Sequence, residues 1–360
     1  MRFITIPMAG LILWQASMVQ AKDMAWTNNQ AMRIFFEATT QIKKLSLDSP
    51  GAGQTTTAAI KAYMQSHDPY GRYLSAKEYK AWKQAQNFAF HGIGMEILER
   101  NGRFYCLPRP LSQALTAGVQ QGDELIGVDD QPVAGRSIYW VGTQIRGEKN
   151  TQVKLKIAHN TRTKELTIKR YPMTDQSVWQ STQNGLFIVR ISHFSSQTLA
   201  QIKAVLASVP KTARLVLDLR NNPGGDLFAA VDIAGLFLPL GSKIMTLETN
   251  QGKIDYHAKG RIWTGRKIAI WQNSFTASAS EVLIAALVGH HTALNFGTPS
   301  HGKAMTQKVV VLSDGSALVI SRGRLYGPGH IFWQTKGLAP RVEIQPKNTA
   351  WAGITQEKLK

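Results

Sequence analysis

The sequence predicts a multidomain α+β protein with a helical N-terminal region, a small β-rich module and an α/β core with a mainly parallel sheet. Three changes of pattern along the 360 residues indicate this order. Residues 22–87 carry apolar positions at helical spacing. Residues 88–170 alternate short strand-like runs with glycine turns. Residues 171–345 repeat the order strand, turn and helix, which is typical of parallel sheets. Residues 346–360 are expected to form a C-terminal tail.

The composition is that of a globular protein, with 43% apolar and 18% charged residues. The chain has 42 Lys and Arg against 23 Asp and Glu, a formal charge of +19. This balance indicates an anionic neighbourhood, such as nucleic acid, a membrane surface or an acidic envelope polymer. Because the basic residues are scattered and no zinc-finger spacing accompanies them, we expect no nucleic-acid partner.

The N-terminus has the pattern of a secretory signal. Arg2 is followed by an apolar stretch from Phe3 to Trp14 and then by small and polar residues up to Ala21. The apolar stretch is shorter than the ~20 residues that span a bilayer. We therefore expect residues 1–21 to be a cleaved signal peptide, with an uncleaved anchor as the alternative. The protein is expected to be exported to the periplasm or cell envelope.

The helical region contains a turn. "MAWTNNQAMRIFFEATTQIKKL" and "TTTAAIKAYMQS" have helical spacing, and "AKEYKAWKQAQ" predicts a further short helix. Between them, "HDPYGRYLS" at residues 67–75 predicts a turn, because Asp-Pro and Tyr-Gly break both periods.

The β-rich module is predicted from four strand-bearing stretches and one short helix. The helix is "SQALTAG" at residues 112–118. The single cysteine, Cys106, excludes an internal disulfide bond. Because it lies in the apolar run "RFYCL", we expect a buried strand residue rather than a reactive thiol. The strands are in "GIGMEILERNGRFYCLP", "GDELIGVDDQPV", "TQVKLKIAH" and "KELTIKR".

In the core, two turns follow predicted strands. "ARLVLDLR" precedes "NNPGG", and "KIAIWQN" precedes "SFTAS". Functional sites of parallel sheets lie at the carboxyl ends of the strands, so both turns are candidates for the site. The remaining core elements are predicted from "GLFIVRIS", "SSQTLAQIKAVLASV", "DLFAAVDIAGLFL", "ASEVLIAALVGHH", "TALNFG" and "TQKVVVLSDGSALVIS".

The stretch "SFTASASE" has two interpretations. Ser278 and Glu281 fit the S-x-x-E pattern of a helix capping box before an apolar helix. The same position also suits a nucleophile, because free amides and the positive end of the helix dipole would stabilise an oxyanion. The small neighbours Ala277 and Ala279 would let a substrate backbone approach closely.

The stretch "LDLRNNPGGD" at residues 217–226 can present backbone amides to an anion, because its glycines follow a strand and precede a helix. The alternative is an ordinary strand-to-helix turn. A nucleotide site is disfavoured, since no Lys-Ser/Thr follows the glycines and the G-x-G-x-x-G spacing is absent.

The loop "GTPSHGKAMTQ" contains Lys303. A lysine is usually solvated, but burial in this Gly- and Ser-containing loop would lower its pKa and make it a general base. His290, His291 and His301 are near in the sequence, so the spacing alone leaves a Ser-His arrangement open.

The order of helical region, GIG-containing module, "LDLRNNPGG", "SASE" and "GK…Q" resembles the C-terminal processing peptidases. These are tail-specific serine proteases of peptidase family S41 that contain a PDZ domain. The resemblance covers about residues 55–345. It implies a PDZ domain at residues 88–170 and an S41 protease core of the ClpP/crotonase-like type at residues 171–345.

The resemblance assigns three catalytic residues. The nucleophile three residues before the glutamate is Ser278, and the general base 25 residues later is Lys303. The residue four positions further on, Gln307, would orient the lysine. Both spacings match, so the histidines become bystanders.

The resemblance also assigns two sets of backbone amides. The oxyanion hole would use the amide of Gly224, with Gly225 the less favoured choice, and that of Ala279. In the PDZ domain, "HGIGMEI" would bind a substrate carboxylate, and the next strand would accept a peptide by β-augmentation. The carboxylate-binding amides are those of Gly92, Ile93 and Gly94.

The resemblance therefore implies an exported serine endopeptidase that cleaves unfolded or C-terminally tagged proteins after capturing their C-termini. Its partners would be proteins or peptides with free C-termini; an envelope adaptor and a homo-oligomer stay open. No metal or organic cofactor is implied.

The sequence departs from the family pattern at several positions, including Asp226 after "NNPGG" and the stretch "LPRPLSQALTAG". Gly289 stands where many members have an aspartate, and the loop around the base reads "SHGKA", with His301 and Ala304. These departures keep an alternative open, a catalytically inactive scaffold that binds peptide C-termini. A small-ligand binder built on the same core is a further alternative.

Overall fold

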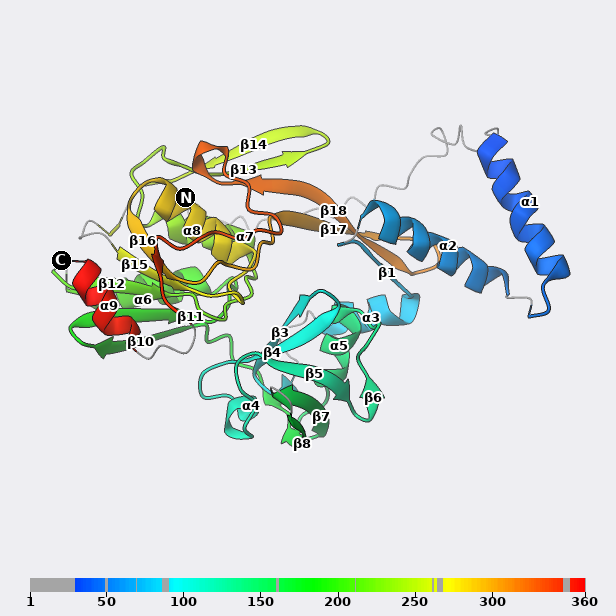
Figure 1. Cartoon of the computed structure of the whole chain (residues 1–360), viewed down its shortest axis with the longest axis horizontal. Helices are drawn as coiled ribbons and strands as arrows, with labels where there is room; N and C mark the ends of the chain where they lie inside the picture. Colours follow the sequence, from blue (N-terminus) through cyan, green and yellow to red (C-terminus); the bar gives the residue numbers. More distant parts are fainter. Residues whose placement is uncertain are drawn as a thin grey trace, which may run out of the picture. The chain divides into compact units, whose positions relative to one another are not determined.

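The computed structural model describes residues 30–48, 51–68, 70–85, 91–159, 162–210, 212–260, 262–263, 268–345 and 350–359 (Figure 1). The signal peptide expected at residues 1–21 lies outside this range. The described residues fall into two compact units, divided between Tyr63 and Met64. Within the described ranges, none of the helices is both long and apolar enough to cross a membrane.

The first unit consists of helix α1 (Gln30–Leu45) and most of helix α2 (Ala52–His67). Both confirm helices predicted from periodicity. α1 is amphipathic, and its apolar side chains, such as Ile34 at 56% and Leu45 at 74%, are exposed. Its last turn carries Lys43 and Lys44, which favour the negative end of the helix dipole.

The second unit begins with the end of α2 and the predicted turn. The carboxylate of Asp68 accepts hydrogen bonds from the amides of Tyr70 and Gly71 and from the amide and hydroxyl of Ser321. Strand β1 (Arg72–Leu74) then pairs antiparallel with β18 (Ala317–Tyr326). These contacts place the chain from Met64 onward with the core, so the two units do not divide at the predicted boundary of residue 87.

Helix α3 (Ala76–Ala85) and the β module follow. The strands of the β module form a sheet in the order β3-β4-β5-β7-β8, with β6 beside β5. In addition, β2 pairs with β9. The predicted short helix is present as α4 (Gln113–Thr116). The strands are β2 (His91–Gly92), β3 (Met95–Arg100), β4 (Arg103–Pro108), β5 (Asp123–Val128), β6 (Gln131–Pro132), β7 (Gln152–His159), β8 (Arg162–Lys169) and β9 (Tyr171–Pro172).

The β module has its own apolar core, which includes Phe104, Leu125 and Leu155. Cys106 belongs to this core and is fully buried, and burial raises the pKa of its thiol, so it is the inert residue that the sequence predicted. The module also contains a helix that we did not predict, α5 (Ile138–Ile145). Its Ile, Tyr, Trp and Val side chains favour strands locally, and the helix is decided by packing instead.

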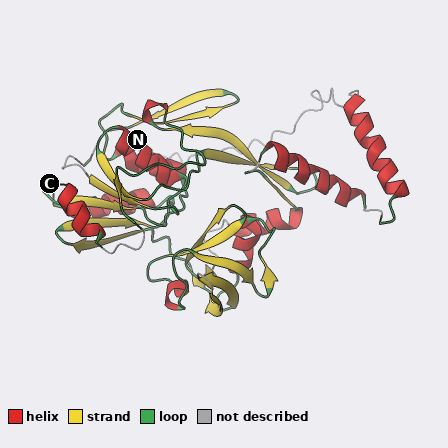
Figure 2. Ribbon diagram, viewed as in Figure 1, coloured by secondary structure: helices red, strands yellow, loops and turns green. Residues whose placement is uncertain are grey.

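The core sheet has the order β10-β11-β12-β15-β16-β19. Figure 2 shows the strands in yellow and the helices in red. β10 pairs antiparallel with β11, and all other neighbours are parallel, which confirms the mainly parallel sheet. The strands are β10 (Val178–Gln183), β11 (Leu186–Ile191), β12 (Arg214–Asp218), β15 (Ile268–Gln272), β16 (Ala293–Gly297) and β19 (Val342–Glu343).

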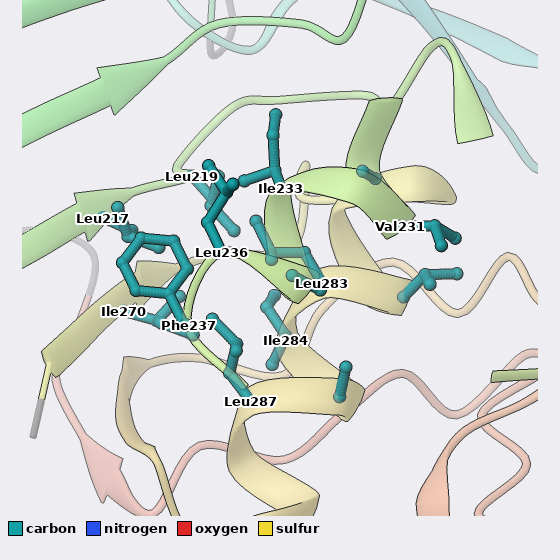
Figure 3. Packing of buried hydrophobic residues seen from close by; sticks show 14 of the residues in the cluster. Leu217, Leu219, Val231, Ile233, Leu236, Phe237, Ile270, Leu283, Ile284 and Leu287 are labelled. Carbon is teal, nitrogen blue, oxygen red and sulfur yellow. The ribbon is translucent and has the colours of Figure 1, made fainter. Parts of the chain in front are cut away.

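Helices cover both faces of this sheet. On β12, Leu215 and Leu217 point to the face covered by α6 (Thr198–Ser208), α7 (Leu227–Gly235) and α8 (Ala279–Gly289). Figure 3 shows Leu217 and Ile270 packed among side chains of α7 and α8. The intervening residue, Val216, points to the other face. A strand buried on both faces needs a continuous apolar run, which here is Leu215, Val216 and Leu217.

The other face is covered by helix α9 (Trp351–Lys358). Trp351 is only 6% exposed and packs against Trp271, whose indole nitrogen donates to the Thr355 hydroxyl at 2.9 Å. We expected residues 346–360 to be a tail. Those described contain a helix that belongs to the core, because the apolar face of the sheet must be covered.

A second, antiparallel sheet has the order β1-β18-β13-β14, with β17 also paired to β18. The hairpin of β13 and β14 was not predicted, because β14 is exposed along most of its length and lacks an apolar signal. The new elements are β13 (Lys243–Thr249), β14 (Gly252–His257), β17 (Met305–Val311) and a 3-10 turn at Pro328–His330.

We predict that Leu217→Ala destabilises the protein by about 2–5 kcal/mol, because it leaves a cavity between the sheet and helices α7 and α8. The measurement is urea-induced unfolding followed by circular dichroism. Leu240→Ala, at a residue that is 78% exposed, is the matched control and should change the unfolding free energy by less than about 0.5 kcal/mol. Equal effects of the two substitutions would contradict the assigned packing.

Candidate active site

The two predicted turns meet at the carboxyl ends of β12 and β15. The Asn221 amide donates to the side-chain oxygen of Asn273 at 3.0 Å, and the Asn273 side chain donates back to Asn221 at 2.7 Å. The carbonyl of Asn222 accepts from the Ala277 amide and from the Ser280 hydroxyl. Two hydrogen bonds therefore join "NNPGG" to Asn273, at the end of the β15 segment, and two join it to "SFTASAS", although some 50 residues separate them in the sequence.

The first turn lies directly against the start of α8. Gly224 has φ +103°, and a Cβ added there would lie 2.8 Å from the Ser278 Cβ and 3.1 Å from the Ala279 nitrogen. Only glycine allows this approach. The Gly224 amide, predicted to bind an oxyanion, donates in this structure to the side-chain oxygen of Asn222 at 2.9 Å. Within the described residues, the Gly225 amide has no such partner.

Ser278 precedes α8 in a conformation that a non-glycine residue rarely adopts, with φ 57° and ψ −116°. Such strain persists only where the surrounding structure fixes it, and it is common at catalytic positions. The residue is half-buried and its successor, Ala279, is fully buried. The hydroxyl thus lies at the N-terminus of an eleven-residue helix, where the dipole favours negative charge.

The carboxylate of Glu281 is the polar centre of the site. One oxygen accepts from the Ser278 amide and the Lys303 amide, each at 2.8 Å. The other accepts from the Ser300 hydroxyl at 2.6 Å and the Gly302 amide at 2.7 Å. The residue is fully buried, and burial raises its pKa, while the four donors lower it in part. Glu281 therefore does more than order the start of α8, which was the role we expected.

Ser278 and Lys303 line one cleft of about 610 Å³. Apolar side chains of Leu227, Leu247 and Leu325 form part of its wall. Burial lowers the pKa of Lys303, and the more distant carboxylates of Glu99 and Glu281 oppose this shift. The lysine ammonium has no hydrogen bond or ion pair within the described residues. A half-buried lysine with a lowered pKa is suited to be a general base.

Gln307 lies in β17 and lines the same cleft. Its side-chain nitrogen donates to the carbonyl of Tyr70 at 2.7 Å, while its side-chain oxygen has no partner in the described part of the chain. The structure thus shows no bond between Gln307 and Lys303. Its predicted role in orienting the lysine stays a prediction, with the oxygen available to accept from Lys303.

Two of the histidines are far from Ser278. His290 and His291 follow the C-terminal end of α8, about 16 Å along the helix from its start at ~1.5 Å per residue. His301 is next to the lysine loop, and burial together with the charges of Arg100 and Lys303 lowers its pKa to about 4. It is therefore neutral near pH 7. None of the three lines the cleft with Ser278.

The departure at Gly289 has a steric reason. A Cβ at this position would lie 3.2 Å from the Cβ of Pro328, a separation tighter than ordinary contact. The larger side chain that many family members carry here would require Pro328 to shift.

The predicted carboxylate-binding loop lines a second cavity of about 340 Å³. This cavity also contains the side chains of Arg109, Arg146 and Lys303. Gly94 has φ +71°, and a Cβ there would lie 2.5 Å from the Ser112 Cβ, so the loop requires glycine. Gly92, Ile93 and Gly94 are therefore brought beside the candidate base, a proximity that the sequence did not indicate.

Comparisons with known proteins find similar proteases. Residues 185–344 match the model of peptidase family S41. A probable CtpA-like serine protease of Staphylococcus epidermidis is 31% identical over 296 residues, 80% of this chain and 60% of that protein. One of Staphylococcus aureus is 29% identical over 283 residues, 77% of this chain and 57% of that protein. The chain thus spans about 60% of the length of these curated relatives.

A solved structure is similar over most of the chain. The photosystem II D1 C-terminal processing protease is 26% identical and aligns with a TM-score of 0.71. The alignment covers 89% of this chain and 94% of that one.

We predict that Glu281→Gln lowers the unfolding free energy by about 3 kcal/mol and slows labelling of Ser278 by a serine-reactive fluorophosphonate at least ~10-fold. The new NH₂ group must face two hydrogen-bond donors in either orientation, so bonds on one side are lost. Urea unfolding and labelling rates measure the two effects. Glu357→Gln, on the exposed side of α9, is the control and should change neither. Unchanged labelling in Glu281→Gln would show that this carboxylate does not position the nucleophile.

Proposed function

Because the chain belongs to peptidase family S41, we propose that it is an exported serine endopeptidase that cleaves unfolded or C-terminally tagged proteins. One observation carries the proposal: Ser278 and Lys303 line the same cleft, and the backbone amides of both are bonded to the Glu281 carboxylate. In this proposal residues 88–170 act as a PDZ domain and residues 171–345 as the protease core.

The first step is attack by Ser278. Neutral Lys303 takes the hydroxyl proton, and the serine oxygen forms a bond to the peptide carbonyl carbon. The carbonyl π electrons move to its oxygen, which becomes the oxyanion. Desolvation of Lys303 favours the neutral amine that this step requires.

The oxyanion is held by backbone amides, each worth about 3 kcal/mol. One belongs to Ala279, at the first position of α8. The other comes from the "NNPGG" turn. In the present conformation we assign it to Gly225, which lines the cleft with Ser278, because the amide of Gly224 already donates to Asn222.

The acyl-enzyme then forms and is hydrolysed. Lys303 gives its proton to the leaving amine as the C–N bond breaks. It next takes a proton from water, which attacks the acyl carbon, and it returns that proton to the Ser278 oxygen as the acyl C–O bond breaks. Gln307 would hold the lysine through its side-chain oxygen, since its nitrogen is fixed by the Tyr70 carbonyl.

Substrate capture would precede these steps. The amides of Gly92–Gly94 bind a terminal carboxylate, and the peptide extends along the next strand. The two cavities support this order, because Lys303 lines both the cavity beside the loop and the cleft with Ser278. A bound C-terminus is therefore delivered next to the candidate base.

We predict that Ser278→Ala and Lys303→Ala each reduce cleavage of a denatured protein with an apolar C-terminus by at least ~10³-fold, because the nucleophile or its base is removed. The assay is gel electrophoresis of the substrate over time. Lys308→Ala, at an exposed residue of β17, should leave the rate unchanged. Undiminished cleavage by either active-site variant would contradict the assignment of Ser278 as nucleophile and Lys303 as base.

The rate is predicted to rise with pH. The neutral fraction of Lys303 increases as pH increases, and burial places its pKa below the ordinary lysine value of about 10.4. The ascending limb of the plot of kcat/KM against pH should therefore have its midpoint below that value. Initial rates on a fluorogenic peptide measure it. An optimum in the acidic range would contradict a lysine base.

The alternative, an inactive scaffold that binds C-termini, predicts peptide binding without cleavage at any pH. Labelling of Ser278 by a fluorophosphonate probe distinguishes the two. A labelled serine supports the protease, and an unlabelled one with retained peptide binding supports the scaffold.

A further inference from the structure

A cavity of about 640 Å³, separate from the cleft of Ser278 and Lys303, lies where the parallel strands of the core end. Arg190 is at the end of β11, Arg220 follows β12, Asn273 follows β15 and Thr298 follows β16. Trp351 of α9 forms another part of the wall. Ligands of parallel sheets bind at the carboxyl ends of strands, and the volume lies in the usual range of ligand sites.

The charged groups that line this cavity are all cationic. Arg190 and Arg220 are its only ionisable lining residues among those the structure describes. The nearest carboxylate is Asp218, which is buried at 4% side-chain exposure and lies beneath them. Two guanidinium groups therefore share one carboxylate, which leaves a positive charge uncompensated at the cavity.

The two arginines differ in how they are held. Arg220 donates two hydrogen bonds to Asp218, at 2.8 and 2.7 Å, and its guanidinium lies 4.6 Å from the ring centroids of Trp271 and Trp351. These contacts fix Arg220 in place. The guanidinium of Arg220 is therefore less free than that of Arg190 to turn toward a ligand.

Arg190 is by contrast nearly unused. It makes one long contact to Asp218, at 3.4 Å, and its buried Nε has no hydrogen-bond partner within the described residues. Its side chain is 25% exposed. A buried donor without a partner is rare in native proteins and requires an explanation. The side chain is positioned to turn toward a ligand in the cavity at little cost.

A neutral side chain of the same cavity wall, that of Asn221, also offers a donor. The side-chain oxygen of Asn221 is occupied by Asn273, at 2.7 Å, but its NH₂ group has no partner in the described part of the chain. The guanidinium of Arg190, whose Nε has no partner, and the NH₂ group of Asn221 together match the two oxygens of a carboxylate. A cation or a neutral apolar group would leave these donors unsatisfied.

We propose that this cavity binds a peptide carboxylate through Arg190 and Asn221. The peptide nature of the ligand rests on the proposed function, whereas recognition of the carboxylate rests on the cavity alone. The carboxylate comes either from an acidic side chain of the substrate or from the free C-terminus of a cleaved product. The aromatic ring of Phe275 and the side chains of Pro108 and Pro110 offer apolar contact to the rest of the peptide.

The test uses the Ser278→Ala protein, which keeps peptides intact, and three labelled pentapeptides followed by fluorescence anisotropy. The first has a central Glu and an amidated C-terminus, the second has Gln in its place and the same amide, and the third has Gln and a free C-terminus. Each is measured with and without the added substitution Arg190→Gln. Arg341→Gln, at an exposed arginine, controls for the loss of one charge.

We expect Arg190→Gln to weaken binding of at least one carboxylate-bearing peptide by ~10-fold or more and to leave the second peptide unaffected. Loss for the first peptide assigns the site to acidic side chains, and loss for the third assigns it to product C-termini. In the proposed function, free C-termini also bind at Gly92–Gly94. Only the part of the third peptide's affinity that is lost with Arg190→Gln is therefore assigned to this cavity. Equal affinities with and without Arg190→Gln for both carboxylate peptides would overturn the proposal.

A second variant distinguishes a loss of carboxylate binding from a loss of folding. Arg190→Lys keeps the charge beside Asp218 but loses the forked donors, so carboxylate binding should fall several-fold while the unfolding midpoint is retained. Unchanged binding by this variant, with Arg190→Gln unfolded, would equally overturn the proposal. The proposed function is tested separately: it is wrong if the unsubstituted protein cleaves no protein substrate. That result would not change what the binding measurements say about the cavity.

Discussion

The buried carboxylate of Glu281 is the interaction on which the site depends. It accepts four hydrogen bonds, two from the backbone of the loop that carries Lys303, one from Ser300 and one from the amide of Ser278. A carboxylate fully removed from water is costly unless its lone pairs are satisfied, so each donor is held where the others require it. The nucleophile and the candidate base are therefore positioned by one shared acceptor rather than by contact with each other.

This constraint explains the strain at Ser278. Its left-handed φ is disfavoured by about 1–3 kcal/mol, and the hydrogen bonds of its own amide and of the neighbouring Ala277 hold it there. Gly224 completes the arrangement, because only a residue without a Cβ allows the "NNPGG" turn to lie against the start of α8. Burial of the site then lowers the pKa of Lys303, so the same close packing that fixes geometry also sets the protonation state.

The parallel sheet places polar groups at one edge. All carboxyl ends of parallel strands lie together at one edge of the sheet. The cleft lined by Ser278 and the cavity lined by Arg190 and Arg220 both include residues that lie at or after these strand ends. The sheet itself was predictable, since strands buried on both faces read as unbroken apolar runs. Elements without such a signal were missed, among them α5, with strand-forming side chains, the exposed hairpin of β13 and β14, and helix α9.

The sequence by itself determined the local features of this protein: most of the helices, the parallel strands, the turns after β12 and β15, and the 25- and 4-residue spacings. Through the resemblance to the C-terminal processing peptidases, these spacings single out Ser278, Lys303 and Gln307 as the predicted catalytic residues. Periodicity and turn chemistry act over a few residues, so they can be read directly. Only the tertiary structure decided which groups are hydrogen-bonded. Gln307 donates to Tyr70, 237 residues away, and the Gly224 amide is taken by Asn222. Such bonds follow from how buried polar groups compete for partners after the chain has packed, and no local pattern encodes that competition.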